Sequence, residues 1–235
     1  FLKGMSIYKK ITGIEKRIID VKDLPITFNG LLDYNIANVM AALAAWQGMK
    51  KFIGVKKESV LKTLKEFGTS PYDNINRFCL LTFNGETVLL GRSKNPESYR
   101  REIAVIKKIK EGMGFDKIVG VLSSIGNRQE NFLREISALV ASGCDYFFIR
   151  PPKSRYLRGR NGEEIVRLLS SHIPKHKILS ERRSSLNDVI SLSRMRLEGK
   201  ILFVVFCTKW EADIDYTQVV EQGERFQHDF NVFRG

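Results

Sequence analysis

Between Thr87 and Phe206, short apolar runs alternate with stretches in which apolar residues recur every three or four positions. The short runs are typical of buried strands, and the three-to-four spacing indicates amphipathic helices. Strands that follow one another through intervening helices predict a mostly parallel sheet with flanking helices. The expected strands are Lys117–Leu122, Asp145–Ile149, Lys177–Leu179 and Ile201–Phe206, and the expected helices are Pro96–Glu111, Arg128–Ala141, Gly162–Ser171 and Ser185–Leu197.

A hairpin precedes this alternation. Strands Arg77–Phe83 and Glu86–Leu90 are joined through Asn84-Gly85, which is a strong signal for a tight two-residue turn. After Cys207 the chain is acidic and has no clear period, although Tyr216–Phe226 is compatible with a helix.

The first part of the chain has a different pattern and predicts a small α+β piece. Its expected elements are strands Ile7–Thr12 and Lys16–Val21 joined through Gly13, a helix Tyr34–Trp46 closed by Gly48, and a helix Lys57–Phe67. The many small residues of the first helix indicate close packing against another element. Gly68–Asp73 is rich in turn residues and contains Pro71, so we expect a domain boundary there.

The net charge of +13 favours anionic partners such as a nucleotide or a carboxylate-bearing substrate. Residues 151–200 carry twelve Lys and Arg against five Asp and Glu. We find no arginine-rich arm, RNA-binding motif or zinc-finger spacing, which disfavours nucleic acid. No apolar run approaches the roughly 20 residues that span a bilayer, and there is no signal peptide, so we expect a cytoplasmic protein without a membrane partner.

The cysteines and histidines indicate no metal site. Cys79, Cys144 and Cys207 lie in or beside apolar segments, as expected for core residues of a reduced protein. His172 and His176 are four residues apart, but Pro174 between them interrupts the helix that this spacing would need.

Several segments, in their order and spacing over about residues 6–206, carry a family resemblance. They are Pro25–Gly30 followed by Tyr34–Ala45, Arg77-Phe78, Thr87–Pro96, Gly126–Glu130 and Arg158–Glu163. Together they resemble the C-terminal part of the Mur ligase family, and the last run is similar to one in cyanophycin synthetase and its relatives.

The resemblance implies an ATP-dependent ligase that joins a carboxylate to an amine through an acyl phosphate. It implies the tail of a central ATP-binding domain in residues 1–70, a Rossmann-like C-terminal domain in 71–210 and a tail in 211–235. The chain contains no Gly-x-x-x-x-Gly-Lys-Ser/Thr phosphate loop. We therefore expect ATP and Mg²⁺ to be held mainly by a region upstream of Phe1, and the chain alone to be inactive.

The resemblance also assigns binding residues, and none that is catalytic or metal-ligating. It places Asn38, Arg77, Lys94 and Asn95 at the nucleotide, and Asn127, Arg128, Arg158 and Arg160 at the acceptor substrate.

Structural alternatives stand beside these roles. For the first helix, the alternative is that Asn35 caps it while Asn38 faces solvent. For Arg77, it is an ion pair with Asp73 or Glu86.

Loop residues also have structural alternatives. Asn95 before Pro96 is a good N-cap, Asn127 with Glu130 resembles a capping box, and Asn161 with Glu164 gives another N-cap pattern. For the loop of Arg155, Arg158 and Arg160, the alternative is a flexible basic loop.

Two departures from the family pattern support a second hypothesis. Gly91 and Lys94 stand where the family has Asp and His, and no Gly-Lys-Gly loop follows Phe206. Under this second hypothesis, the chain is a degenerate, non-catalytic Mur-like module for structure or protein interaction. A third hypothesis, a nucleic-acid-binding domain, is supported by charge alone. The sequence does not identify the carboxylate, the amine, the pathway or the oligomeric state.

Overall fold

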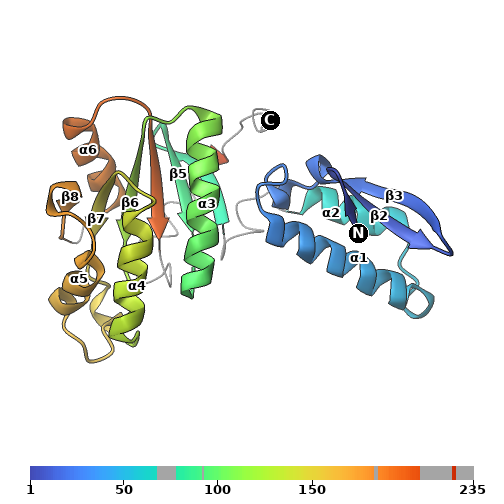
Figure 1. Ribbon diagram of the computed structural model, residues 1–235, viewed down its shortest axis with the longest axis horizontal. Coiled ribbons are helices and arrows are strands. Elements are labelled where there is room, and N and C mark those ends of the chain that lie inside the picture. The colour runs from blue at the N-terminus through green and yellow to red at the C-terminus, as the bar shows by residue number, and fades with distance from the viewer. Residues whose placement is uncertain (68–77, 92, 183–184, 207–223, 226–235) are drawn as a thin grey trace. The chain divides into compact units, whose positions relative to one another are not determined.

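The structure is a computed structural model that describes residues 1–67, 78–91, 93–182, 185–206 and 224–225 (Figure 1). These residues form two compact units, one within residues 1–74 and the other within residues 75–227. We refer to them as unit 1 and unit 2. The expected boundary segment Gly68–Asp73 lies outside the described residues, as do Arg77 and Cys207.

Unit 1 packs a small antiparallel sheet against two helices. The sheet has the order β1 (Leu2–Lys3), β2 (Ser6–Ile11), β3 (Ile14–Asp20), and the helices are α1 (Asp33–Ile53) and α2 (Lys57–Glu66), with short 3-10 turns at Val21–Asp23 and Pro25–Thr27. The expected hairpin is confirmed: Thr12 and Gly13 turn with φ of 48° and 85°. The core of unit 1 consists of Ile7, Ile19, Val21, Leu24, Ile36, Val39 and Leu43.

Helix α1 is longer than the sequence predicted. It passes through Gly48 and ends at Gly54, whose φ of 63° gives a left-handed cap. A mid-helix glycine lowers helix stability by only about 1 kcal/mol, and the neighbouring turns outweigh it. The close packing expected from the small residues of this helix is wrong for its alanines, which are all exposed: Ala37, Ala41, Ala42, Ala44 and Ala45.

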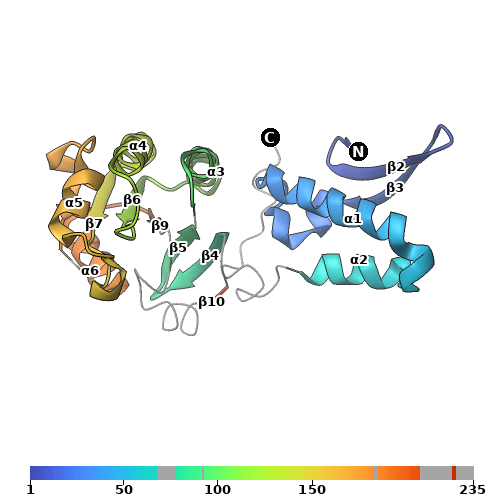
Figure 2. The same cartoon turned by 90° about the horizontal axis from the view of Figure 1, so that it is seen from below.

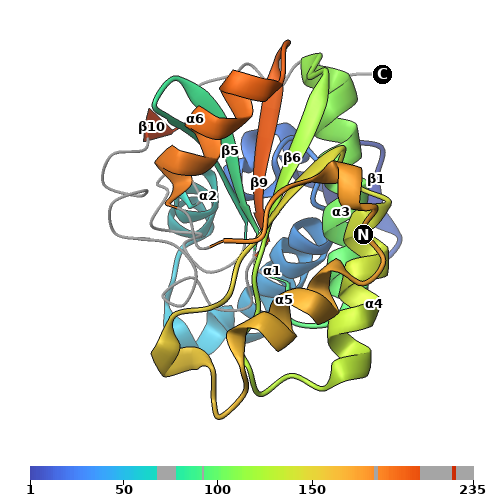
Figure 3. The same ribbon diagram turned by 90° about the vertical axis from the view of Figure 1, so that its left-hand side faces the viewer.

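Unit 2 contains the mostly parallel sheet that the sequence predicted, and the α/β fold class is confirmed. Within the described residues the strand order is β10-β4-β5-β9-β6-β7-β8. The strands are β4 (Phe78–Phe83), β5 (Glu86–Gly91), β6 (Lys117–Leu122), β7 (Tyr146–Ile149), β8 (Ile178–Ser180), β9 (Ile201–Phe206) and β10 (Glu224–Arg225). Neighbours from β5 to β8 are parallel, whereas β4 and β10 are antiparallel. Figure 3 shows β5, β9 and β6 side by side.

Helices cover both faces of this sheet. They are α3 (Pro96–Met113), α4 (Glu130–Ala141), α5 (Gly162–Ser170) and α6 (Leu186–Arg196), with 3-10 turns at Ser154–Tyr156 and Lys175–Lys177. Helices α3 and α4 lie over one face, and α6 lies over the other (Figure 2). On the α6 face, Val88, Leu90, Val121, Phe203 and Val205 pack against Leu186, Val189, Ile190 and Leu197. Burial of this apolar surface is the main stabilising contribution to unit 2.

The turn between β4 and β5 and the segment after β9 can also be compared with the sequence predictions. The Asn84-Gly85 turn is confirmed, with φ of 50° and 76° between β4 and β5. The expected helix Tyr216–Phe226 is wrong at Glu224–Arg225, the only part of it that the structure describes, because these residues form β10. They pair with Leu81 and Thr82 at the open edge of β4, where backbone groups need partners.

The cysteines and the helices also bear on the sequence predictions. Cys79 and Cys144 are buried free thiols, as expected of core residues. In the described part of the chain, every helix is too short or too polar to cross a membrane.

Candidate functional site

The ends of four neighbouring strands form one row in unit 2. Gly91 pairs with Phe206, Phe206 with Leu122, and Leu122 with Ile149. These residues close β5, β9, β6 and β7, and the loops that follow them therefore meet at the carboxyl edge of the sheet. Ligands of open α/β sheets bind at this edge.

Polar side chains are buried at this edge, in a sheet whose interior is otherwise apolar. They are Ser93, Glu102, Ser123, Ser124 and Arg150, each between 0% and 6% exposed. Buried polar groups nearly always have hydrogen-bond partners. The hydroxyls of Ser123 and Ser124 have none in the described residues. Sequence reasoning missed this pair, although two serines directly after the uncharged run Ile118–Leu122 are a usable signal.

Two loops at this edge touch each other. They are the β6–α4 loop (residues 123–129) and the β7–α5 loop (residues 150–161). The Gly126 amide donates to the Tyr156 carbonyl at 3.0 Å. A Cβ at Gly126 would lie 1.7 Å from the Leu157 carbonyl oxygen, so only glycine fits there. This contact brings the loop that carries Arg128 against the loop that carries Arg158 and Arg160.

The arginines of the two loops differ in their surroundings. Arg128 is half-buried with its guanidinium 5.0 Å from the centre of the Phe132 ring, and its buried Nε has no hydrogen-bond partner among the described residues. Arg160 is half-buried and lies 3.7 Å from Glu164, and its buried Nη1 also lacks a partner in that part of the chain. Arg158 is exposed at a φ of 53°. Arg128 and Arg160 therefore keep donor capacity that an anion could use.

The start of α4 corrects one prediction. Asn127 is exposed and does not cap the helix, because α4 begins at Glu130 and its N-cap is Gln129, which makes no side-chain cap. The Gly126 contact with Leu157 fixes the loop and displaces the helix start beyond the expected capping box. The first-turn amides of α4 therefore have no side-chain cap, and such amides favour anions.

The β5–α3 loop supports the structural alternative for Asn95. Its side chain accepts from the Ser98 amide at 2.8 Å, and Ser98 Oγ accepts from the amides of Asn95 and Lys94. This is the capping box that opens α3. Lys94 is exposed and leaves its ammonium group for solvent or a ligand. A surface hollow of 590 Å³ lies beside Asn95, but its arginines Arg100 and Arg101 are paired with Glu135 and Glu97.

Glu102 is a second residue that sequence reasoning missed. Its carboxyl fills the space beside Gly91, where a Cβ would lie 1.3 Å from Oε1. Ser93 Oγ donates to Oε2, and Oε1 has no hydrogen-bond partner within the described part of the chain. Burial raises the pKa of Glu102 to about 8, and the Ser93 hydrogen bond opposes this shift. The available signal was its position three residues after Tyr99 and four before Ile106, inside the apolar stripe of α3.

In unit 1, the structural alternative fails for Asn35 and holds for Asn38. The N-cap of α1 is Leu32, and buried Asn35 donates from Nδ2 to the Ile26 carbonyl at 2.7 Å. Asn38 is exposed, as its structural alternative expects, and its Nδ2 lies 3.4 Å from Asn35 Oδ1. Its amide oxygen and most of its donor capacity remain available to a ligand.

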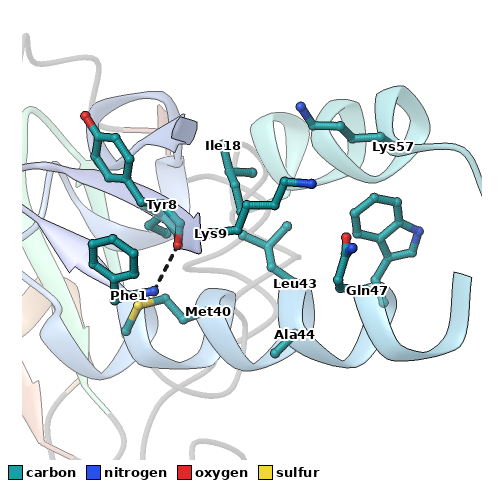
Figure 4. A pocket seen from close by; sticks show the side chains of 11 residues that line it. Phe1, Tyr8, Lys9, Ile18, Met40, Leu43, Ala44, Gln47 and Lys57 are labelled. Carbon is teal, nitrogen blue, oxygen red and sulfur yellow. Dashed lines mark hydrogen bonds between the residues drawn. The ribbon is translucent and has the colours of Figure 1, made fainter. Parts of the chain in front are cut away.

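Unit 1 also has an apolar pocket of 300 Å³ between the β2–β3 hairpin, α1 and α2 (Figure 4). Ile7, Ile18, Met40 and Leu43 contribute to its apolar wall, while Lys9 and Lys57 bring charge. Neither Asn35 nor Asn38 lines it. The nucleotide role of Asn38 therefore gains no support from this pocket.

No cluster of three or more His, Cys, Asp or Glu side chains suited to a metal ion occurs in the described ranges. The guanidinium donors of Arg128 and Arg160 at the carboxyl edge of unit 2 have the chemistry to pair with a phosphate or a carboxylate. Those residues offer no carboxylate set for Mg²⁺.

Comparison with known proteins shows similarity in fold at low sequence identity. No family model matches the chain, and no curated protein matches it. E. coli FolC in complex with ADP matches with a TM-score of 0.51 at 14% identity, over 78% of this chain and 37% of that chain. A UDP-N-acetylmuramoyl-L-alanyl-D-glutamate–2,6-diaminopimelate ligase matches with a TM-score of 0.45 at 15% identity, over 85% and 37%. Folylpolyglutamate synthase of Mycobacterium tuberculosis, complexed with ADP and AMPPCP, gives 0.47 at 14% identity, over 77% and 38%.

The chain thus resembles FolC in its α/β fold. It spans less than two fifths of the length of these structures. At such identities the similarity concerns the fold alone.

Proposed function

We propose that this chain is the C-terminal portion of an ATP-dependent carboxylate–amine ligase, which closes over the nucleotide and presents the acceptor amino acid. The proposed parts are the tail of the ATP-binding domain in residues 1–70, the C-terminal domain in 71–210 and a tail in 211–235. The chain alone is not expected to turn over.

The observation that carries this proposal is the contact between the two arginine-bearing loops. Gly126 and Leu157 bring Arg128 and Arg160 onto adjacent loops at the carboxyl edge. Each retains a buried guanidinium nitrogen without a partner. Charge-assisted hydrogen bonds of guanidinium to carboxylate are about twice as strong as neutral ones. We assign the carboxylate of the acceptor amino acid to this pair.

This assignment defines what the residues contribute to the reaction. ATP supplies the acyl phosphate, and the acceptor amine attacks it. Arg128 and Arg160 hold the acceptor carboxylate, which fixes the direction of the amine and reduces the entropy cost of the encounter. Arg158 and Asn127, both exposed, complete the proposed acceptor site.

For the nucleotide we retain Asn38, Arg77, Lys94 and Asn95, with different degrees of structural support. Lys94 offers an exposed cation for a phosphate. Asn95 is committed to the α3 cap, so its part is to place Lys94 rather than to contact the nucleotide through its amide oxygen. Arg77 lies outside the described residues.

Titration calorimetry tests the acceptor site. We expect the chain to bind at least one amino acid from a full panel, and Arg128→Gln or Arg160→Gln to weaken binding about tenfold, since hydrogen bonds to charged groups contribute about 1.5–3 kcal/mol. Arg167→Gln is the matched control, because Arg167 is exposed on α5 and does not belong to either of the two loops. An equal loss in all three variants contradicts the assignment.

The second candidate is the degenerate module without catalysis. It is favoured by Gly91 and by the commitment of Asn95 to the α3 cap. It predicts a folded chain that binds neither ADP nor any amino acid in the same titrations. Binding of an oligonucleotide that falls steeply with salt instead favours the nucleic-acid hypothesis.

A further inference from the structure

A buried carboxyl stands at the end of β5, and it comes from a helix rather than from the strand. Gly91 is the last residue of β5 and pairs with Phe206, the last residue of the neighbouring strand β9. Glu102, on the second turn of α3, is 6% exposed and fills the side-chain position of Gly91. The two residues are therefore interdependent: any side chain at 91 would displace the carboxyl.

Ser93 connects this carboxyl to the β5–α3 loop. Ser93 is 3% exposed, and its hydroxyl is bonded to Glu102 Oε2. The next two residues, Lys94 and Asn95, donate their amides to Ser98 Oγ. The Ser93–Glu102 hydrogen bond thus holds the buried end of residues 93–95. The capping box of α3 holds the exposed end of the same segment.

The surroundings of Glu102 disfavour its ionised form. Ser93 is its hydrogen-bond partner in the described residues, and no cation there forms an ion pair with it. Tyr99, one turn earlier on α3, stacks on Phe206. Burial raises the pKa of the Cys144 thiol, before β7, and the Asp145 and Glu102 carboxylates raise it further. Farther charges on these elements, Lys110 and Asp145, pair with each other at 2.9 Å. A buried carboxylate without a counter-charge is costly, whereas a neutral acid is not.

We propose that Glu102 is a positioning residue, whose neutral acid form holds Ser93 and thereby fixes residues 93–95 at the carboxyl edge. Loss of the proton releases this segment, because the carboxylate is better solvated outside the site. Lys94 is the residue of this segment that we assigned to the nucleotide. The effect of Glu102 on nucleotide binding therefore rests on the proposed function. Its effect on the position of residues 93–95 does not.

Amide hydrogen exchange of the full chain tests the hold on the loop without any ligand. After correction for intrinsic exchange, we expect protection of the Lys94 and Asn95 amides to fall about tenfold per pH unit between about pH 5 and about pH 8, and then to level off. Glu102→Gln keeps the shape and carries no titrating proton, so its protection should stay constant over this range. Parallel profiles in the two proteins would overturn the proposal.

Ser93→Ala provides a second variant in case Glu102→Gln folds poorly. It removes the attachment itself, so protection of Lys94 and Asn95 should already be low at about pH 5 and respond little to pH. A pH response equal to that of the unsubstituted chain would also overturn the proposal.

Titration with ADP on the same samples separates the two proposals. If ADP binds, its affinity should decrease over the pH range in which protection decreases, and Glu102→Gln should remove this dependence. If ADP does not bind at any pH while protection responds as expected, the nucleotide role fails and the role of Glu102 stands. If ADP binds with the same pH profile in both proteins and protection does not respond, the role of Glu102 fails.

Discussion

The backbone of Gly126 lies against the carbonyl of Leu157, so close that a methyl group at position 126 would be 1.7 Å from that oxygen. The obstacle is backbone rather than the flexible end of a side chain, and it is part of the loop that carries Arg158 and Arg160. The two loops of the proposed acceptor site are therefore held together through a position where no other residue fits.

Gly126→Ala should separate the two loops. We expect it to lower the free energy of unfolding of unit 2 by about 1–3 kcal/mol, the usual cost of overpacking. Binding of the acceptor amino acid should weaken as well. Urea denaturation measures the stability, with Asn127→Ala as the control next in sequence. Titration calorimetry measures the binding, with Arg167→Gln as the control because Arg167 is exposed on α5. A Gly126→Ala protein as stable as the control would contradict the contact.

Arg128→Lys separates charge from geometry at the acceptor site. Lysine keeps the positive charge but has no planar fork for two parallel hydrogen bonds to a carboxylate. We expect amino-acid affinity to fall about tenfold, close to the loss expected for Arg128→Gln. Full retention of affinity in Arg128→Lys would mean that the site senses charge alone.

The helix caps give a matched pair of substitutions. Asn161 accepts from the Glu163 amide at 2.9 Å at the start of α5, as the sequence predicted, whereas Asn127 caps nothing. Asn161→Ala should therefore cost about 1 kcal/mol of unfolding free energy, and Asn127→Ala close to zero. Chemical denaturation of the two variants measures the difference. Equal losses would mean that Asn127 forms the capping box that the sequence predicted.

Residues whose environment is local were predicted well. The strand Lys117–Leu122 has the expected bounds, because the uncharged run Ile118–Leu122 between polar residues leaves little choice of structure. The Asn84-Gly85 turn and the Asn95 cap are also local, since both depend on backbone conformations and hydrogen bonds within four residues.

Residues whose environment is set by distant parts of the chain were predicted poorly. The start of α4 depends on the Leu157 carbonyl, which is thirty-one positions after Gly126 and gives no signal in the local sequence. Glu102 looks like a helix-surface residue until Gly91 on β5 is known to leave room for its carboxyl. The order of parallel strands predicted that the loops of Arg128 and Arg160 leave the same edge of the sheet, but it did not predict the backbone contact between Gly126 and Leu157.

Gly48 and Gly54 test where α1 ends. Gly48 is exposed inside the helix, and a Cβ there meets nothing within 4 Å, so Gly48→Ala should stabilise unit 1 by about 0.5–1 kcal/mol. Gly54 has a φ of 63°, so Gly54→Ala should destabilise it by about 1 kcal/mol. Urea denaturation followed by tryptophan fluorescence, with Trp46 on α1 as a reporter, gives both signs. Destabilisation by both substitutions would mean that α1 ends at Gly48, as the sequence predicted.

Glu102→Gln should change how stability depends on pH. The folded chain keeps the Glu102 proton up to about pH 8, whereas the unfolded chain releases it near the ordinary value of 4.5. Between these values the unfolded state binds fewer protons, so the contribution of Glu102 is fully present below the lower value and is lost as pH rises. The free energy of unfolding should decrease by at most about 1.4 kcal/mol per pH unit across this window and level off above it.

The measurement is urea denaturation of both proteins at several pH values, and the result is the difference between their profiles. Because the amide introduced by Glu102→Gln does not titrate, contributions from every other group cancel in this difference to first order. The variant should gain stability relative to the unsubstituted chain as pH rises toward 8. A difference that is independent of pH would mean that Glu102 ionises normally in the folded chain, and the carboxyl beside Gly91 would then have to be solvated or paired.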